Sequence, residues 1–218
     1  MKLADYLPAI MPAIASLAFL LLFTVRWLRQ RRGKKPAVKV IKNPKVMVAS
    51  LGDAPLSDIG ATDATVYSAY FDSVGVAKLP TAAALSDFLV EEHPDILHLY
   101  CNLNENGELT DDRGGTLPGG AFLEACRRAG VTLLFFASDN PGDHYSRAFS
   151  KHRRGPGNGV DVVWTLERRG ENFPFFLGEL LKGMSKGEPM LKVWVQVAPQ
   201  AQGEWMEKLP STVYMPNS

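Results

Sequence analysis

An uninterrupted run of 19 uncharged residues, from Leu7 to Val25, places the strongest constraint on how this chain folds. At about 1.5 Å of rise per residue, such a run reaches across the roughly 30 Å hydrocarbon core of a bilayer. The next ten residues, 26–35, hold six basic residues and no acidic one, and basic residues beside a span stay on the cytoplasmic side. We therefore expect residues 1–29 to form a single-pass transmembrane anchor in the inner (cell) membrane, with the C-terminal domain in the cytoplasm.

The order of these segments differs from that of a cleavable signal peptide, in which basic residues precede a shorter apolar stretch. Lys2 is the only basic residue before the apolar run, and no small-residue cleavage site follows the run. Residues 30–45 then form a basic juxtamembrane linker. We expect the lipid bilayer as a partner, with headgroups contacting the first basic cluster, which consists of Arg26, Arg29, Arg31, Arg32, Lys34 and Lys35. The alternative is that these charges only fix the orientation of the anchor.

The two parts of the chain carry opposite charge. Residues 1–45 hold ten basic residues and one acidic residue, whereas residues 46–218 hold 14 basic and 22 acidic residues. An acidic domain lacks the electrostatic footprint of a nucleic-acid-binding protein, so we expect no nucleic-acid partner. Within the span, Ala9 and Ala13 have the small-xxx-small spacing of packed helices, which is compatible with self-association of the anchor.

Residues 46–218 have the length of one domain, and apolar runs of strand length alternate within them with segments of helical pattern. This alternation predicts a three-layer α/β domain with a mostly parallel six-stranded sheet. The expected strands are residues 46–50, 65–70, 95–100, 131–137, 160–166 and 191–197. The expected helices are residues 81–92, 120–129 and 173–184, and a hairpin-like loop follows the third strand.

The segments that leave the third and fourth expected strands are the first places to look for a site, because ligands of open α/β sheets bind at the carboxyl ends of the strands. We expect a ligand or partner crevice lined by polar residues of both segments, namely Asn102, Asn104, Asp139, Asn140, Asp143 and His144. The two cysteines, Cys101 and Cys126, form no disulfide framework, and no Cys and His spacing indicates structural zinc. We expect no cofactor and no metal.

The order of elements over residues 90–186 resembles that of the CHAT and caspase-like cysteine peptidases. The similar segments are 95–102, a hairpin around 107–117, 133–139 and 175–185. In that family a histidine follows the first of these strands and a cysteine ends the second, and the imidazole activates the thiol. In this chain the two positions fall on Asn102 and Asp139. The resemblance therefore implies a caspase-like fold that has lost its peptidase chemistry.

Three hypotheses on function follow. The first is a catalytically inactive, membrane-anchored interaction module or membrane effector with an unknown protein partner, which the resemblance connects with bacterial defence or cell death. The second is a cysteine hydrolase that uses Cys101 or a rearranged dyad with His144; His98 is three residues before Cys101 on a strand and so faces the opposite side. The third is a small-ligand sensor, for example of a nucleotide, although the glycine-rich segments lack the spacing of a P-loop.

Overall fold

The computed structural model describes residues 41–52, 55–138, 140–149, 159–165, 172–198 and 212–215. These residues belong to one unit of the chain, residues 39–218. The predicted anchor, the cluster of six basic residues and most of the predicted linker lie outside the described residues. Within the part of the chain that is described, no helix has the length and apolar character needed to cross a bilayer.

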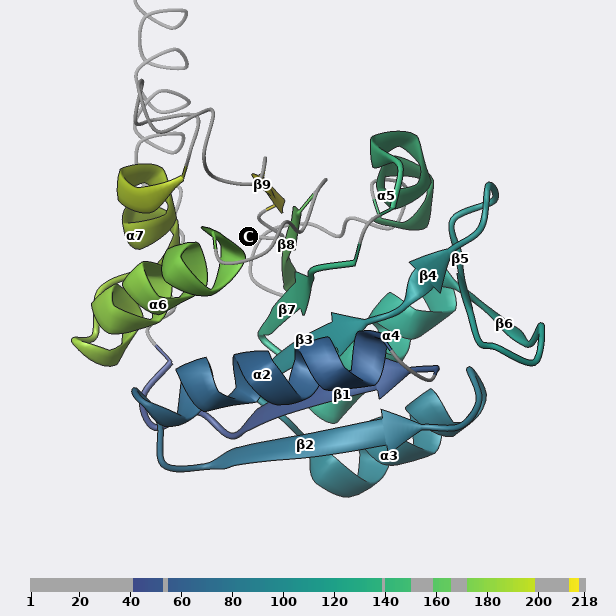
Figure 1. Cartoon of the computed structure of the whole chain (residues 1–218), viewed down its shortest axis with the longest axis horizontal. Coiled ribbons are helices and arrows are strands. Elements are labelled where there is room, and N and C mark those ends of the chain that lie inside the picture. Colours follow the sequence, from purple (N-terminus) through teal and green to yellow (C-terminus); the bar gives the residue numbers. More distant parts are fainter. Residues whose placement is uncertain are drawn as a thin grey trace, which may run out of the picture. The chain divides into compact units, whose positions relative to one another are not determined.

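A six-stranded sheet forms the centre of the described structure (Figure 1). Its strands follow the order β2-β1-β3-β7-β8-β9, in which the first five are parallel and β9 is antiparallel to β8. The strands are β1 Val46–Leu51, β2 Val74–Leu79, β3 Ile96–Tyr100, β7 Leu133–Phe136, β8 Asp161–Thr165 and β9 Thr212–Met215. Because the chain reverses its direction across the sheet between β1 and β3, the carboxyl ends of these strands flank the topological switch point.

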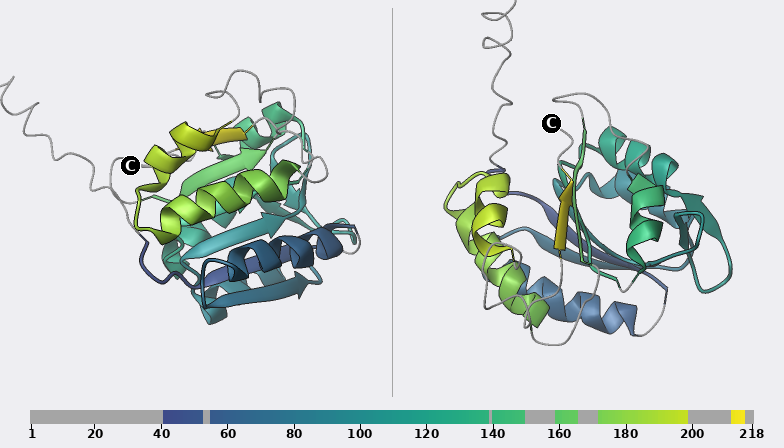
Figure 2. Two further views of the ribbon diagram at one scale, coloured as in Figure 1. Left: turned by 60° about the vertical axis from the view of Figure 1, so that its left-hand side comes forward. Right: turned by 90° about the horizontal axis from the view of Figure 1, so that it is seen from above.

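Helices cover both faces of this sheet (Figure 2). One face carries α3 (Ala84–Glu92), α4 (Gly119–Ala129) and α5 (Gly142–Phe149). The other face carries α2 (Leu56–Ser68), α6 (Asn172–Ser185) and α7 (Met190–Val197). The strands β1, β3 and β7 are buried along their whole length, as expected for parallel strands covered on both faces. The prediction of an α/β domain with a mostly parallel sheet is confirmed.

A small antiparallel sheet follows β3 and confirms the predicted hairpin. Its order is β4-β5-β6, with β4 at Asn102–Leu103, β5 at Glu108–Thr110 and β6 at Thr116–Pro118. Gly107, at φ +76°, lies in the turn between β4 and β5, and a Cβ atom there would stand 2.5 Å from the backbone nitrogen of Ala148 in α5. Only glycine therefore allows this turn to pack directly against α5.

The predicted strand at residues 65–70 is wrong, because these residues belong to the end of α2 and the turn that follows it. The buried residues of α2 recur at helical spacing against the sheet: Gly60, Asp63, Ala64 and Tyr67. The hydroxyl of Thr65 donates to the backbone carbonyl of Thr62 at 2.6 Å, which accommodates this β-branched residue in the helix. The second strand of the chain is instead β2, where Gly75 interrupts the apolar pattern.

The predicted strand at residues 191–197 is also wrong, because this segment is helix α7. Pro189 is the N-cap residue, and Met190 and Val193 are the buried residues at helical spacing. A Cβ atom on Gly183 of α6 would stand only 2.6 Å from Val193, so the two helices pack closely at this point. The buried residues Met190 and Val193 pack α7 against the core that α6 shares with the sheet, and the sixth strand of the sheet is β9.

Candidate functional site

The carboxyl ends of β3 and β7 meet the start of α2 in a cavity of about 250 Å³. An apolar wall from α2 and polar groups from the strand ends line this cavity, which is formed by Pro55, Leu56, Ile59, Tyr100, Asn102, Ala137 and Ser138. Pro55 is the N-cap residue of α2, so the positive end of the helix dipole borders the cavity. Of the predicted crevice residues that the structure describes, Asn102 alone lines this strand-end cavity.

Asn102 is exposed on β4 and lies at the lining of the strand-end cavity. Its backbone carbonyl accepts a hydrogen bond from the hydroxyl of Thr110 at 3.2 Å. Within the described part of the chain, its side-chain amide makes no hydrogen bond. An amide can both donate to and accept from a ligand, but it cannot relay a proton at neutral pH. Asn102 is therefore suited to binding and unsuited to acting as a general base.

Tyr100 and Ser138 form the buried floor of the cavity. The hydroxyl of Tyr100 donates to the carboxylate of Asp63, which ties β3 to α2. The hydroxyl oxygen of Ser138 accepts from the backbone nitrogen of Cys101 at 2.8 Å. Both side chains are almost wholly buried, so their positions are fixed before any ligand arrives.

Asn140 joins the two segments that leave β3 and β7. Its side-chain oxygen accepts from the backbone nitrogen of Leu103 at 2.7 Å. Its side-chain nitrogen donates to the carbonyl of Cys101 at 3.2 Å and to the hydroxyl oxygen of Tyr145 at 3.3 Å. These bonds continue the pairing of the two strands beyond their ends. Asn140 is 5% exposed, so it positions the β3–β4 segment and does not line an open crevice as predicted.

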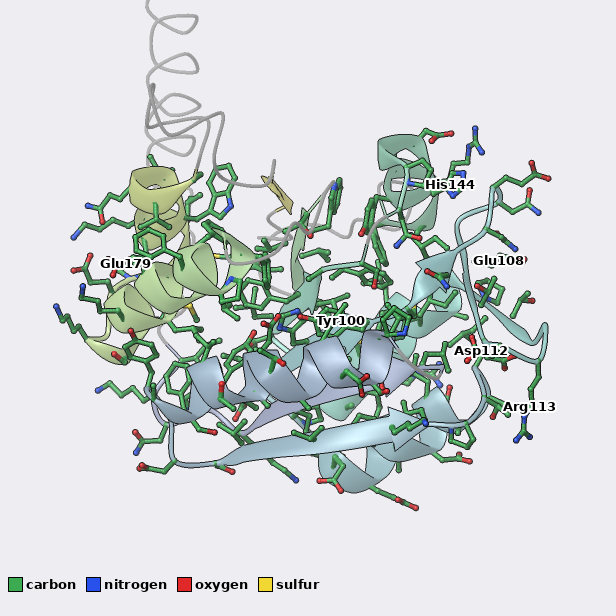
Figure 3. All side chains as sticks on the ribbon, in the orientation of Figure 1. Tyr100, Glu108, Asp112, Arg113, His144 and Glu179 are labelled. Atoms are coloured by element: carbon green, nitrogen blue, oxygen red, sulfur yellow. The ribbon has the colours of Figure 1, made fainter. Side chains whose placement is uncertain are left out.

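His144 lies on α5, half-buried, and faces the same segment (Figure 3). Its Nδ1 atom is 3.0 Å from the carbonyl oxygen of Leu103, which can only accept, so Nδ1 carries the hydrogen and Nε2 is the acceptor of the neutral ring. The neighbouring Asp143 pairs instead with Arg147, at 2.9 Å, and Arg147 also donates to the carbonyl of Glu105. The backbone of the β3–β4 segment, rather than a carboxylate, therefore orients this imidazole.

The remaining predicted crevice residues do not converge on the cavity. Asn104 is a turn residue, because its side-chain oxygen accepts from the backbone nitrogens of Asn106 and Glu108, each at 3.0 Å. Asp143 is exposed on α5, away from the cavity lining. Asp139 lies outside the described residues. The sequence pattern therefore indicates the edge of the sheet at which this cavity lies, but it names mostly residues that shape that edge.

Neither cysteine thiol reaches solvent. Cys101 and Cys126 are both 0% exposed in the core beneath α3 and α4. Burial raises the pKa of the Cys101 thiol well above its usual value, and burial likewise raises the pKa of Cys126. A thiol that stays protonated and inaccessible does not act as a nucleophile. This geometry disfavours Cys101, alone or with His144, as a catalytic residue.

His98 is enclosed on the opposite face of the sheet from Cys101, as its spacing predicts. Its ring stacks on Tyr100 with centroids 4.7 Å apart and meets the edges of Tyr67 and Phe173 at 5.7 Å and 5.8 Å. These neighbours belong to the core under α2 and α6, whereas Cys101 belongs to the core under α3 and α4. His98 is therefore part of an aromatic cluster and does not activate the thiol.

The acidic residue Asp111 serves the structure of the hairpin. It is buried, and its carboxylate accepts hydrogen bonds from the backbone nitrogens of Ala82 at 2.8 Å, Arg113 at 2.9 Å and Gly115 at 2.7 Å. The bond from Ala82 does most to hold the pKa of this carboxyl below its usual value. Among the described residues, no three His, Cys, Asp or Glu side chains come together in a way that could hold a metal ion.

No family model and no curated protein matches this sequence. Among solved structures, one match is the alanine–glyoxylate aminotransferase from Nostoc sp., with 18% sequence identity and a TM-score of 0.34. The match covers 59% of this chain and 31% of the aminotransferase, so this chain corresponds to less than a third of that protein. A likeness of this size carries no argument about function.

Proposed function

We propose that this protein is a membrane-anchored, catalytically inactive caspase-like module that acts by binding a protein partner at the carboxyl ends of its strands. The burial of Cys101 is the observation that carries this proposal. Its side chain is 0% exposed and burial raises the pKa of its thiol, whereas a cysteine nucleophile must meet its substrate as a thiolate. Asn102 occupies the position of the family's histidine, and an amide cannot take up and return a proton.

The order of the described elements supports the resemblance on which the proposal rests. Strand β3, the hairpin β4–β6, helix α4 and strand β7 follow one another, and β3 and β7 are neighbours in the sheet. Asn102 thus follows β3, and β7, the strand that precedes Asp139 in the sequence, is the parallel neighbour of β3. Asn102 is exposed there on β4. Among the predicted crevice residues that the structure describes, it is the one that lines the strand-end cavity.

The strand-end cavity is the binding site in this proposal. Its volume of about 250 Å³ suits one large side chain of a partner better than a whole drug-sized ligand, which needs about 300–1,000 Å³. Leu56 and Ile59 give it an apolar wall, and none of the lining residues is charged. We therefore expect the partner to insert an apolar side chain, while the amide of Asn102 hydrogen-bonds the partner's backbone.

Affinity capture with a matched pair of variants tests this binding site. Asn102 and Asn106 are both exposed asparagines of the hairpin region, but only Asn102 lines the cavity. Full-length wild type, Asn102→Arg and Asn106→Arg are each used as bait in detergent extracts of the native host. We expect a protein that wild type and Asn106→Arg retain and Asn102→Arg loses, with Cys101→Ala behaving as wild type. Loss of biological activity with Cys101→Ala, while the variant still retains the partner, would favour the cysteine hydrolase.

The anchor is tested separately by fractionation of cells that express the full-length chain. We expect the protein in the membrane pellet after extraction with alkaline carbonate, because about 20 apolar residues hold a span in the bilayer. The control variant replaces Leu17 and Ala18 with arginine, and it should lose this retention because each charge near the centre of a span costs about 2.5–3.5 kcal/mol. Release of the unaltered full-length chain into the supernatant overturns the membrane part of the proposal.

A small-ligand sensor is the second candidate, and the positive end of the α2 dipole at the cavity favours it. Such a ligand binds the native state only and therefore raises the unfolding temperature. A thermal-shift screen of the full-length protein with nucleotides separates the two candidates. A shift that Asn102→Arg abolishes and Asn106→Arg retains supports the sensor, and the absence of any shift at saturating nucleotide removes it.

A further inference from the structure

Helix α7 presents apolar side chains to solvent as well as to the core. Met190 and Val193 are buried in the core cluster that α6 shares with the sheet, whereas Leu191 is 49% and Val195 is 52% exposed. Leu191 and Val195 are four residues apart, so they lie on the same side of the helix, one turn apart. We call this pair the α7 stripe. Apolar side chains that adjoin on one exposed helix face are a candidate contact surface.

The α7 stripe lies at the end of the domain where the chain enters from the linker. A cavity of about 330 Å³ there is lined by residues of three segments, namely Ile41, Lys42 and Asn43, Tyr70 and Phe71, and Met184, Ser185, Lys186 and Gly187. The turn that leads into α7 is therefore beside the first described residues. Figure 1 shows the turn between α6 and α7 on the side of the domain where β1 and β2 begin, and the hairpin β4–β6 beyond their arrowheads.

The length of the linker limits how far this end of the domain lies from the bilayer. In the proposed function, the basic cluster that ends at Lys35 sits at the level of the lipid headgroups. Ile41 is six residues further along, and six extended residues reach at most about 20–22 Å. In the proposed function Ile41 therefore lies within about 22 Å of the headgroups, a limit that parts of the domain further from Ile41 do not share.

The lysines at the turn that leads into α7 suit an anionic membrane surface. Lys42 and Lys186 are exposed and make no ion pair within the described part of the chain. Lys192 pairs with Glu188 at 2.8 Å, which neutralises that acid beside the stripe. Apolar side chains flanked by lysines are the usual composition of a helix that lies in the headgroup layer.

We propose that α7 is a second membrane contact, in which Leu191 and Val195 enter the headgroup region of an anionic bilayer while Lys42 and Lys186 face the lipid phosphates. This inference rests on the proposed anchor and gives the domain a fixed orientation. The amino ends of the strands face the bilayer, and the strand-end cavity at the opposite end stays open to the cytoplasm for a partner.

Depth-dependent quenching tests this contact in the full-length protein reconstituted into vesicles of phosphatidylcholine with phosphatidylglycerol. An environment-sensitive dye is attached to Leu191→Cys or, as a second position, Val195→Cys; the native Cys101 and Cys126 are buried and do not compete for it. Arg113→Cys, at the hairpin end of the domain in Figure 3, is the matched exposed control. Leu20→Cys reports on the anchor itself.

Lipids that carry a spin label near the headgroup should quench the dye at residue 191 or 195 at least about twofold, since the helix face would lie about 5–10 Å inside the headgroup boundary. The dye at residue 113 should lose little intensity.

Three outcomes would overturn the inference. If lipids labelled along the acyl chain quench a dye at residue 20, but headgroup-labelled lipids do not quench dyes at residues 191 and 195, the anchor stands and this inference fails. A blue shift at 191 without quenching also overturns it, because a protein or a second copy then covers α7. Without quenching at residue 20, the anchor fails and the inference fails with it.

Discussion

Replacing Asn140 with alanine is the most informative single perturbation of the strand-end region. The change removes the acceptor of the 2.7 Å bond from the Leu103 nitrogen and the donor of the bonds to Cys101 and Tyr145. Leaving a buried backbone N–H unsatisfied costs about 1–3 kcal/mol, and each further bond contributes about 0.5–1.5 kcal/mol. Since the two donated bonds are long, we expect a total loss of about 3 kcal/mol in the free energy of unfolding.

Thermal and urea unfolding of the full-length protein in detergent micelles measures this loss. For a domain of this size, 1 kcal/mol corresponds to about 2–4 °C in the unfolding temperature, so Asn140→Ala should lower it by about 6–12 °C. Asn106→Ala is the matched control. Asn106 is exposed in the β4–β5 turn, and its replacement should change the free energy of unfolding by less than about 0.5 kcal/mol.

Asn140→Asp separates the accepted bond from the donated ones. Aspartate keeps the oxygen that accepts from the Leu103 nitrogen, but it loses both donated bonds and turns an oxygen toward the Cys101 carbonyl. We predict that this variant is less stable at neutral pH than in mild acid, where a protonated carboxyl can donate again.

For Asn140→Ala, a loss below about 1 kcal/mol in the free energy of unfolding would show that Asn140 does not hold the two strand ends together.

Other positions give independent checks. The pKa of Asp111 is lowered, chiefly by the hydrogen bond from the Ala82 nitrogen, so the charged carboxylate stabilises the fold. Urea titrations of wild type and Asp111→Asn measure this contribution. The difference in their free energies of unfolding should be constant above about pH 5 and shrink below about pH 4. In α6, Gly178→Ala should stabilise by about 0.5–1 kcal/mol, because a Cβ atom there meets nothing closer than 3.8 Å. Gly183→Ala should destabilise the domain instead, because the Cβ atom would stand 2.6 Å from Val193. If thermal melts showed a higher unfolding temperature for both variants, the close packing of α6 on α7 would be contradicted.

The parts of the fold that can be predicted are those in which local pattern and tertiary contact agree. The buried strands β1, β3 and β7 are predominantly apolar runs, and α4 ends at Gly130 in the left-handed conformation, as its sequence indicates. The end of α2 and the whole of α7 have sequences typical of strands, because β-branched and aromatic residues are frequent in both. Contacts outside each segment decide the outcome, since α2 packs on the sheet and Val193 of α7 packs on Gly183.

The sequence predicts the place of the candidate site but not its composition. Asn102 follows a buried strand, and this signal alone indicates the edge of the sheet at which the cavity lies. Leu56 and Ile59 cannot be predicted as a wall of the cavity, because this role requires α2 to be a helix that starts beside β3. Asn140 has the pattern of a ligand-facing residue, but its amide satisfies backbone groups that only the folded chain brings within reach.

Thiol reactivity of the folded protein bears most directly on the proposed loss of catalysis. The full-length chain in detergent is treated with iodoacetamide at about pH 7, and adducts are counted by intact mass before and after unfolding. We predict no adduct on the folded chain and one on each cysteine after denaturation, since Cys101 and Cys126 are both buried. Rapid addition of one equivalent at Cys101 of the folded protein would contradict this prediction and indicate a reactive thiolate.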